Sequence, residues 1–205
     1  MSTTSALLHQ FDTAEQQKDA STLGMWMFLV TEIMFFGGMF TAYIVYRTLH
    51  PEGFVEASHE LNLTMGAINT AVLICSSLTM VLAVHAAQTG GRKSTAGYLI
   101  ATILLGAVFL GIKAVEYNEK FVNHHVPGPS FHFDGTHAAN AQLFFSLYFV
   151  MTGLHAVHMI IGIVLLTILA IRAYRGAFSP GYYTPVDMTG LYWHFVDIVD
   201  RKSVV

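Results

Sequence analysis

Residues 138–171 read AANAQLFFSLYFVMTGLHAVHMIIGIVLLTILAI and contain no Asp, Glu, Lys or Arg. A helix needs about 20 apolar residues to cross the hydrocarbon core of a bilayer. This stretch exceeds that length, so we expect a transmembrane helix that tilts or protrudes from the membrane. It decides the class of the fold, because it indicates an integral membrane protein.

Three further apolar runs precede this stretch. They extend from about residue 23 to 46, from 65 to 87 and from 95 to 115, and the first carries one charge, Glu32. A fifth run begins near Asp187 and stops being apolar after Val199. The sequence therefore predicts an all-α, polytopic membrane helix bundle with four complete transmembrane helices and the start of a fifth.

The composition supports this class. The chain is 54% hydrophobic and 11% charged, whereas soluble domains carry about 25% charged residues. Its 205 residues leave no room for a soluble domain beside the spans. The net charge of −3 argues against a nucleic-acid partner, and the single cysteine cannot form an internal disulfide.

Basic residues predict the orientation, since cytoplasmic loops carry an excess of Lys and Arg. We divide the chain into a polar segment, residues 1–20, and a bundle, residues 21–199. More basic residues fall on the side of the N-terminus than on the other side, which places the N-terminus in the cytoplasm. The first group is Lys18, Arg92, Lys93, Arg172 and Arg175, and the second is Arg47 and Lys120.

Glu32 is the most informative polar residue. It follows Leu23 by nine positions, near the middle of the membrane at about 1.5 Å per residue. A charge there costs roughly 2.5–3.5 kcal/mol on insertion scales. One interpretation is a neutral, hydrogen-bonded carboxyl that ties two helices together. The other is a proton-handling or lipid-contacting site, and both stay open.

Polar residues of the third and fourth spans are weaker candidates. His155 and His158 lie three positions apart on one face and could bind a metal. No third ligand shares that face, so we favour neutral histidines that hydrogen-bond between helices. Glu116 lies between Lys113 and Lys120, and we expect a charge ladder that anchors the helix at the interface.

The start of the fifth run gathers Trp193, His194 and Asp197. His194 and Asp197 are three positions apart and can pair, while Trp193 and Tyr192 are types that lie at headgroup level. The sequence has no phosphate-binding glycine loop, no Cys-x-x-Cys and no cluster of Cys and His that could hold copper. We therefore expect no metal and no redox centre in this chain.

Five stretches carry a family pattern: LGMWMFLVTEIMFFGG at residues 23–38, NTAVL at 69–73, KAVEY at 113–117, TGLHAVH at 152–158 and YWHFVDIV at 192–199. In this order they resemble subunit III of the haem-copper (cytochrome c) oxidases, and they cover nearly all of residues 22–199. The first span with Glu32 is similar to the short five-helix bacterial type.

This resemblance implies a subunit of a proton-pumping terminal oxidase in a bacterial inner membrane, which reduces oxygen to water in aerobic electron transport. Such a subunit packs beside subunit I, which holds the haems and copper, in a complex with subunit II. It carries no redox centre, binds phospholipid between its helices, and supports proton uptake and the durability of subunit I.

The family motifs also imply roles for residues, none of them catalytic. Glu32 matches the buried family carboxylate that reacts with carbodiimides. Together with Glu32, we assign Glu116, His155 and His158 to proton or lipid contacts. We assign Trp193, His194 and Asp197 to the packing of subunits or helices.

Residues 200–205, DRKSVV, depart from the apolar continuation of the family. We interpret the chain as truncated at its C-terminus, with a tail that is an artefact of a truncated sequencing read. Because charges inside a bilayer are costly, we expect the fifth segment to stay on the cytoplasmic side or to fray there.

Other functions remain open. A haem-binding membrane anchor would use His85 and His155 as axial ligands from different helices. A small transporter with Glu32 as its proton site would need discontinuous helices or a repeat, and the sequence has neither. Within the family, an accessory subunit of a nitric oxide reductase is the nearest alternative, and the electron donor is either cytochrome c or quinol.

Overall fold

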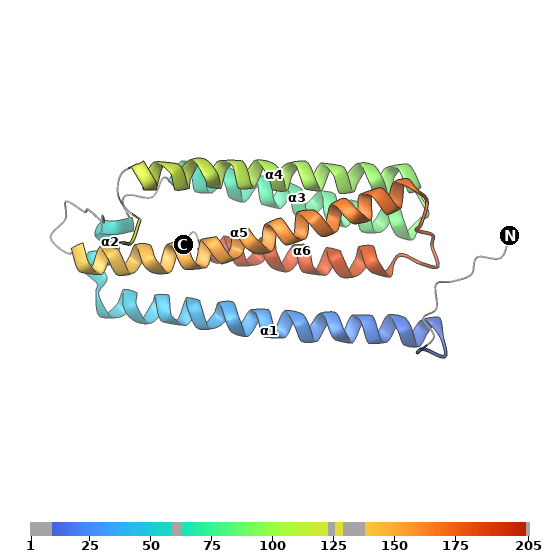
Figure 1. The fold of residues 1–205 in the computed structure, drawn as a ribbon, viewed down its shortest axis with the longest axis horizontal. Coiled ribbons are helices and arrows are strands. Elements are labelled where there is room, and N and C mark those ends of the chain that lie inside the picture. The colour runs from blue at the N-terminus through green and yellow to red at the C-terminus, as the bar shows by residue number, and fades with distance from the viewer. Residues whose placement is uncertain (1–9, 59–62, 123–125, 129–137, 204–205) are drawn as a thin grey trace.

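The computed structural model describes residues 10–58, 63–122, 126–128 and 138–203, and most of this part of the chain is helical (Figure 1). Four of its helices are long and apolar enough to cross a membrane: α1, α3, α4 and α5. The predicted all-α membrane bundle is therefore confirmed, with α6 as the shorter additional segment. The helices are α1 (Ala14–Leu49), α2 (Pro51–Ser58), α3 (Leu63–Gln88), α4 (Arg92–Val122), α5 (Ala138–Tyr174) and α6 (Thr184–Ser203).

The long helices lie nearly parallel in layers (Figure 1). α3 packs on α4, and α5 and α6 form the middle layer, since α5 contacts α4 and α6 contacts α3. α1 lies on the other side of this middle layer. Within the described residues it contacts α2, α5 and α6 but neither α3 nor α4.

The helix ends follow local sequence signals. Thr13 caps α1, because its Oγ1 accepts a hydrogen bond from the backbone N–H of Gln16 at 3.1 Å. α1 therefore begins well before the apolar run, and part of the predicted polar segment forms its first turns. Between α3 and α4, Gly90 adopts a φ of 77°, which is costly for residues with a side chain. This lets Gly91 donate to the carbonyl of Ala86 and reverses the chain within a few residues.

Two segments differ from the sequence expectation. α2 was not expected, because its eight residues are too few to give the hydrophobic pattern of a membrane-spanning helix. Its Phe54 and Ala57 are nevertheless buried against α5. Of the tail that was expected to stay on the cytoplasmic side or to fray there, residues 200–203 continue α6, and Asp200 is fully buried.

Trp193 lies at the centre of the bundle. Its side chain is fully buried, and the indole N–H donates to the hydroxyl oxygen of Ser76 on α3 at 2.8 Å. Gly106 on α4 and Gly162 on α5 face the indole ring closely, where no larger residue fits without a shift. Trp193 and Tyr192 are both core residues of the helix packing.

Candidate functional site

Glu32 on α1 contacts His158 on α5. The Oε2 atom of Glu32 lies 3.1 Å from Nε2 of His158. The other ring nitrogen, Nδ1, lies 2.9 Å from the backbone carbonyl of Leu154. A carbonyl only accepts, so Nδ1 carries a proton and donates it. Nε2 and the carboxyl then share one further proton, held either as a neutral acid and imidazole or as an ion pair.

This pair lies at the edge of the bundle. The side chains of Glu32 and His158 are 18% and 16% exposed. On the inner side the ring of Phe36 packs edge-on against His158 at a centroid distance of 5.3 Å. The hydroxyl of Tyr192 donates to the backbone carbonyl of His158 at 2.9 Å and ties α6 to the same turn of α5. The pair is thus fixed by three helices and open on one side.

His155 does not join this pair, although it lies one turn away on α5. It is buried beside Phe109, and its Nε2 lies 3.6 Å from Oδ1 of Asp200 on α6. In the described part of the chain no three His, Cys, Asp or Glu side chains form a group that could hold a metal. The alternative of a haem bound between His85 and His155 does not fit this structure either, because His85 is exposed and His155 is buried.

Lys113 and Glu116 belong to a second, interior group. Nζ of Lys113 lies 3.1 Å from Oε2 of Glu116, and both side chains are only 9% exposed. The hydroxyl of Tyr148 on α5 donates to Oε1 of Glu116. The predicted pairing within α4 is present, but the prediction of an interface anchor is wrong, because the pair faces α5 and not the surface. Lys120 is buried as well.

A buried charge is tolerated when it is paired and hydrogen-bonded. Glu116 meets this condition with one cation and one hydroxyl donor, from Lys113 and Tyr148. Asp200 lies in the same interior region, where it faces His155. Sequence reasoning missed Asp200 because its charge appeared to belong to a polar tail. It also missed that Tyr148 binds Glu116 from another helix.

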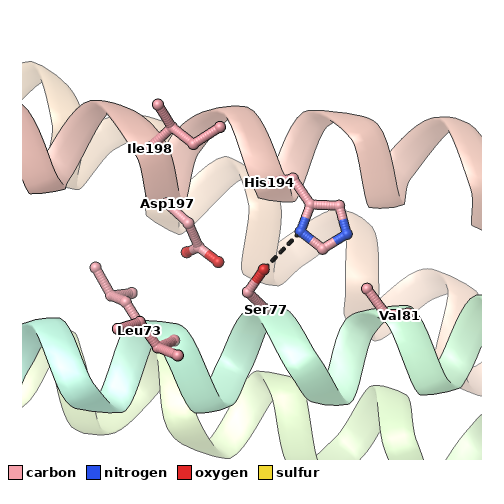
Figure 2. A pocket seen from close by; sticks show the side chains of 7 residues that line it. Leu73, Ser77, Val81, His194, Asp197 and Ile198 are labelled. Atoms are coloured by element: carbon pink, nitrogen blue, oxygen red, sulfur yellow. Dashed lines mark hydrogen bonds between the residues drawn. The ribbon is translucent and has the colours of Figure 1, made fainter.

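His194 and Asp197, from the start of the fifth run, lie at the contact of α6 with α3 (Figure 2). Nδ1 of His194 lies 2.8 Å from Oγ of Ser77, while Trp193 reaches Ser76. The expected pairing of His194 with Asp197 is wrong: among the described residues neither carboxylate oxygen of Asp197 has a hydrogen-bond partner. The serines on α3, which sequence reasoning did not single out, supply the polar contacts instead.

The sequence of this chain is similar to those of known proteins. The family model described as cytochrome c oxidase subunit III matches residues 4–201. Cytochrome c oxidase subunit 3 of Corynebacterium diphtheriae is 32% identical over 180 residues, which are 87% of this chain and 82% of that protein. Cytochrome c oxidase subunit 3 of Thermostichus vulcanus is 31% identical over 189 residues, 92% and 86%. Quinol oxidase subunit 3 of Bacillus subtilis is 34% identical over 178 residues, 86% and 80%.

Proposed function

Because this chain belongs to the cytochrome c oxidase subunit III family, and so is subunit III of a haem-copper terminal oxidase, we propose that it supports proton uptake and the stability of subunit I without a redox centre of its own. In this role the chain holds and hands on protons at the membrane, while oxygen is reduced in subunit I. The relatives are named as subunits of both cytochrome c and quinol oxidases, and the role is the same for either donor.

The contact between Glu32 and His158 is the observation that supports this role. A carboxyl and an imidazole that share one proton can release or take up that proton with little movement. The side chains are partly exposed at the bundle edge, so a neighbouring subunit or a chain of water molecules can reach them. A carboxyl that only stabilised the helix packing would not need this partial exposure.

The partners and the location follow from the same role. We propose that the chain assembles with oxidase subunits I and II, and that phospholipid covers its apolar outer faces. Bacterial relatives support a place in the bacterial inner membrane as a multi-pass protein. We place the N-terminal end in the cytoplasm, where Lys18 contacts Tyr183 and Arg92 binds the carbonyl of Tyr174.

Substitution of Glu32 tests this proposal in the assembled oxidase. Glu32→Gln keeps the size of the side chain and removes the titrating group. We expect normal assembly and a changed dependence of turnover on pH. His158→Gln should give the same change, and the double variant should go no further, since the two residues share one proton.

The matched control is Glu119→Gln, which makes the same chemical change at an exposed position of α4. A hydrophobic carbodiimide should label the wild type and Glu119→Gln but spare Glu32→Gln. A pH profile of Glu32→Gln identical to that of the control would reduce Glu32 to a packing residue and refute the role in proton uptake.

A further inference from the structure

A pocket of about 450 Å³ lies between α3 and α6, on a different helix pair from the Glu32–His158 contact (Figure 2). Its walls are mostly apolar and include Leu73 and Val81 from α3. Ile74 and Ile198 form its rim and are 52% and 56% exposed. The pocket therefore opens sideways on the outer surface of the bundle, where lipid would lie.

Asp197 is the unusual member of this pocket. The residue is only 5% exposed, and within the described part of the chain both carboxylate oxygens lack a hydrogen-bond partner. Figure 2 shows its carboxylate pointing across the pocket toward α3, between Leu73 and Ser77. The other polar residues of the pocket lining, Ser77 and His194, bind each other. Buried polar groups in folded proteins are nearly always satisfied, so we expect here a donor that the described pocket residues do not supply.

The depth of the pocket restricts where this donor can come from. Leu73 lies about 15 Å along α3 from Leu63, at a rise of about 1.5 Å per residue. This places the pocket inside a hydrocarbon core that is about 30 Å thick. Lipid headgroups stay at the two ends of the helix. A donor at this depth must arrive on a molecule that dissolves in the membrane.

A hydroxyl group fits Asp197 in either protonation state. An ionised carboxylate only accepts, whereas a neutral carboxyl also donates one proton, and a hydroxyl can both donate and accept. The volume lies within the range of about 300–1,000 Å³ typical of small-molecule pockets, which are apolar with a few placed polar groups. A lipid acyl chain would fill the volume but leave Asp197 without a donor. One side chain from a neighbouring helix would bring a donor but fill only part of the volume.

We propose that this pocket binds a membrane-soluble small molecule that carries a hydroxyl group on an apolar body, and that the hydroxyl bonds to Asp197. The apolar body lies along Leu73 and Val81 and leaves the pocket past Ile74 and Ile198. The site is independent of the proposed proton role, because it shares no residue with the Glu32–His158 pair.

Photolabelling of the assembled oxidase in native membranes tests this site with two probes. One is 4-octylphenol with a diazirine in its chain, and the other is the same molecule without the hydroxyl. The phenol should label peptides of α3 and α6 around the pocket saturably, and unlabelled 4-octylphenol should compete. One hydrogen bond should favour the phenol over the hydrocarbon probe about three- to tenfold.

Three variants separate the hydroxyl contact from simple filling. Asp197→Leu keeps an apolar volume and should lower phenol labelling to the level of the hydrocarbon probe. Ile74→Trp should block both probes. Leu78→Trp, on an exposed part of α3 outside the pocket lining, should block neither.

The wild type alone decides the outcome if Asp197→Leu fails to assemble. Equal labelling by the two probes would show that the hydroxyl is not recognised and would overturn the proposal. Labelling by neither probe would overturn it as well. Crosslinking of Ile198→Cys to another subunit would then assign the pocket to a partner helix.

Discussion

Adding one methyl group at Gly162 should destabilise the bundle at Trp193. A Cβ atom at Gly162 would lie 2.8 Å from Cζ3 and 3.0 Å from Cε3 of the indole. The ring cannot retreat, because a Cβ atom at Gly106 on the opposite helix would lie 2.9 Å from its Cη2. The bond from the indole N–H to Ser76 fixes the ring further.

The size of the effect follows from two opposing terms. Overpacking a core costs about 1–3 kcal/mol, while alanine in place of glycine stabilises a helix interior by about 0.5–1 kcal/mol, so Gly162→Ala should lose about 1–2 kcal/mol. Gly153→Ala on the same helix is the control, since its nearest neighbour outside the helix would be the Tyr117 hydroxyl at 4.0 Å. That control should be neutral or slightly stabilising.

Reversible unfolding of the purified chain in sodium dodecyl sulfate, followed by helical circular dichroism, measures these free energies. The decisive step is to repeat Gly162→Ala in the Trp193→Phe background. Phenylalanine lacks the indole atoms Cζ3 and Cη2, which make the shortest contacts on the two sides, so the clash is relieved and the two substitutions should couple by about 1 kcal/mol or more. Strictly additive losses, or an equal loss in Gly153→Ala, would refute the packing of Trp193 between two glycines.

Three further measurements test other parts of the structure. Lys113→Met should cost about 3–5 kcal/mol in the same titration, because it leaves a buried carboxylate uncompensated, and adding Glu116→Gln should recover most of that loss; no recovery would contradict the pairing. Tyr148→Phe removes one donor to Glu116 and should cost about 1–3 kcal/mol, and a neutral result would contradict the bond. A reporter that is active only in the cytoplasm should be on in the loop between α3 and α4 and off in the loop after α4, and the reverse pattern would invert our orientation.

The membrane helices could be predicted because hydropathy acts along the chain. The predicted fourth span, residues 138–171, differs from α5 by only a few residues at one end. The start of α1 was harder to predict, since the cap at Thr13 extends this helix into polar residues that lie outside the apolar run. The sequence of α2 is too short to show a clear hydrophobic periodicity. This helix is held in place by contacts with α5, which lies far from it in the sequence.

The positions and partners of the polar residues were harder to predict, because a sequence does not say which side of a helix faces the interior. Lys113 and Glu116 have the spacing of an interface pair, and only the packing of α5 turns them into a buried one. Asp200 was expected at the surface, and its burial beside His155 depends on the register of α6 against α5. Glu32 was recognised from its depth alone, but its partner lies on another helix.

The position of α1 on the outside of the middle layer gives the chain an order of assembly. α1 is synthesised before α5 and α6, the two long helices on which it packs. His158 follows Glu32 by 126 residues, so at about 5–20 residues per second the ribosome needs about 6–25 s to supply it. Throughout that time the Glu32 carboxyl of the growing chain lacks its imidazole partner.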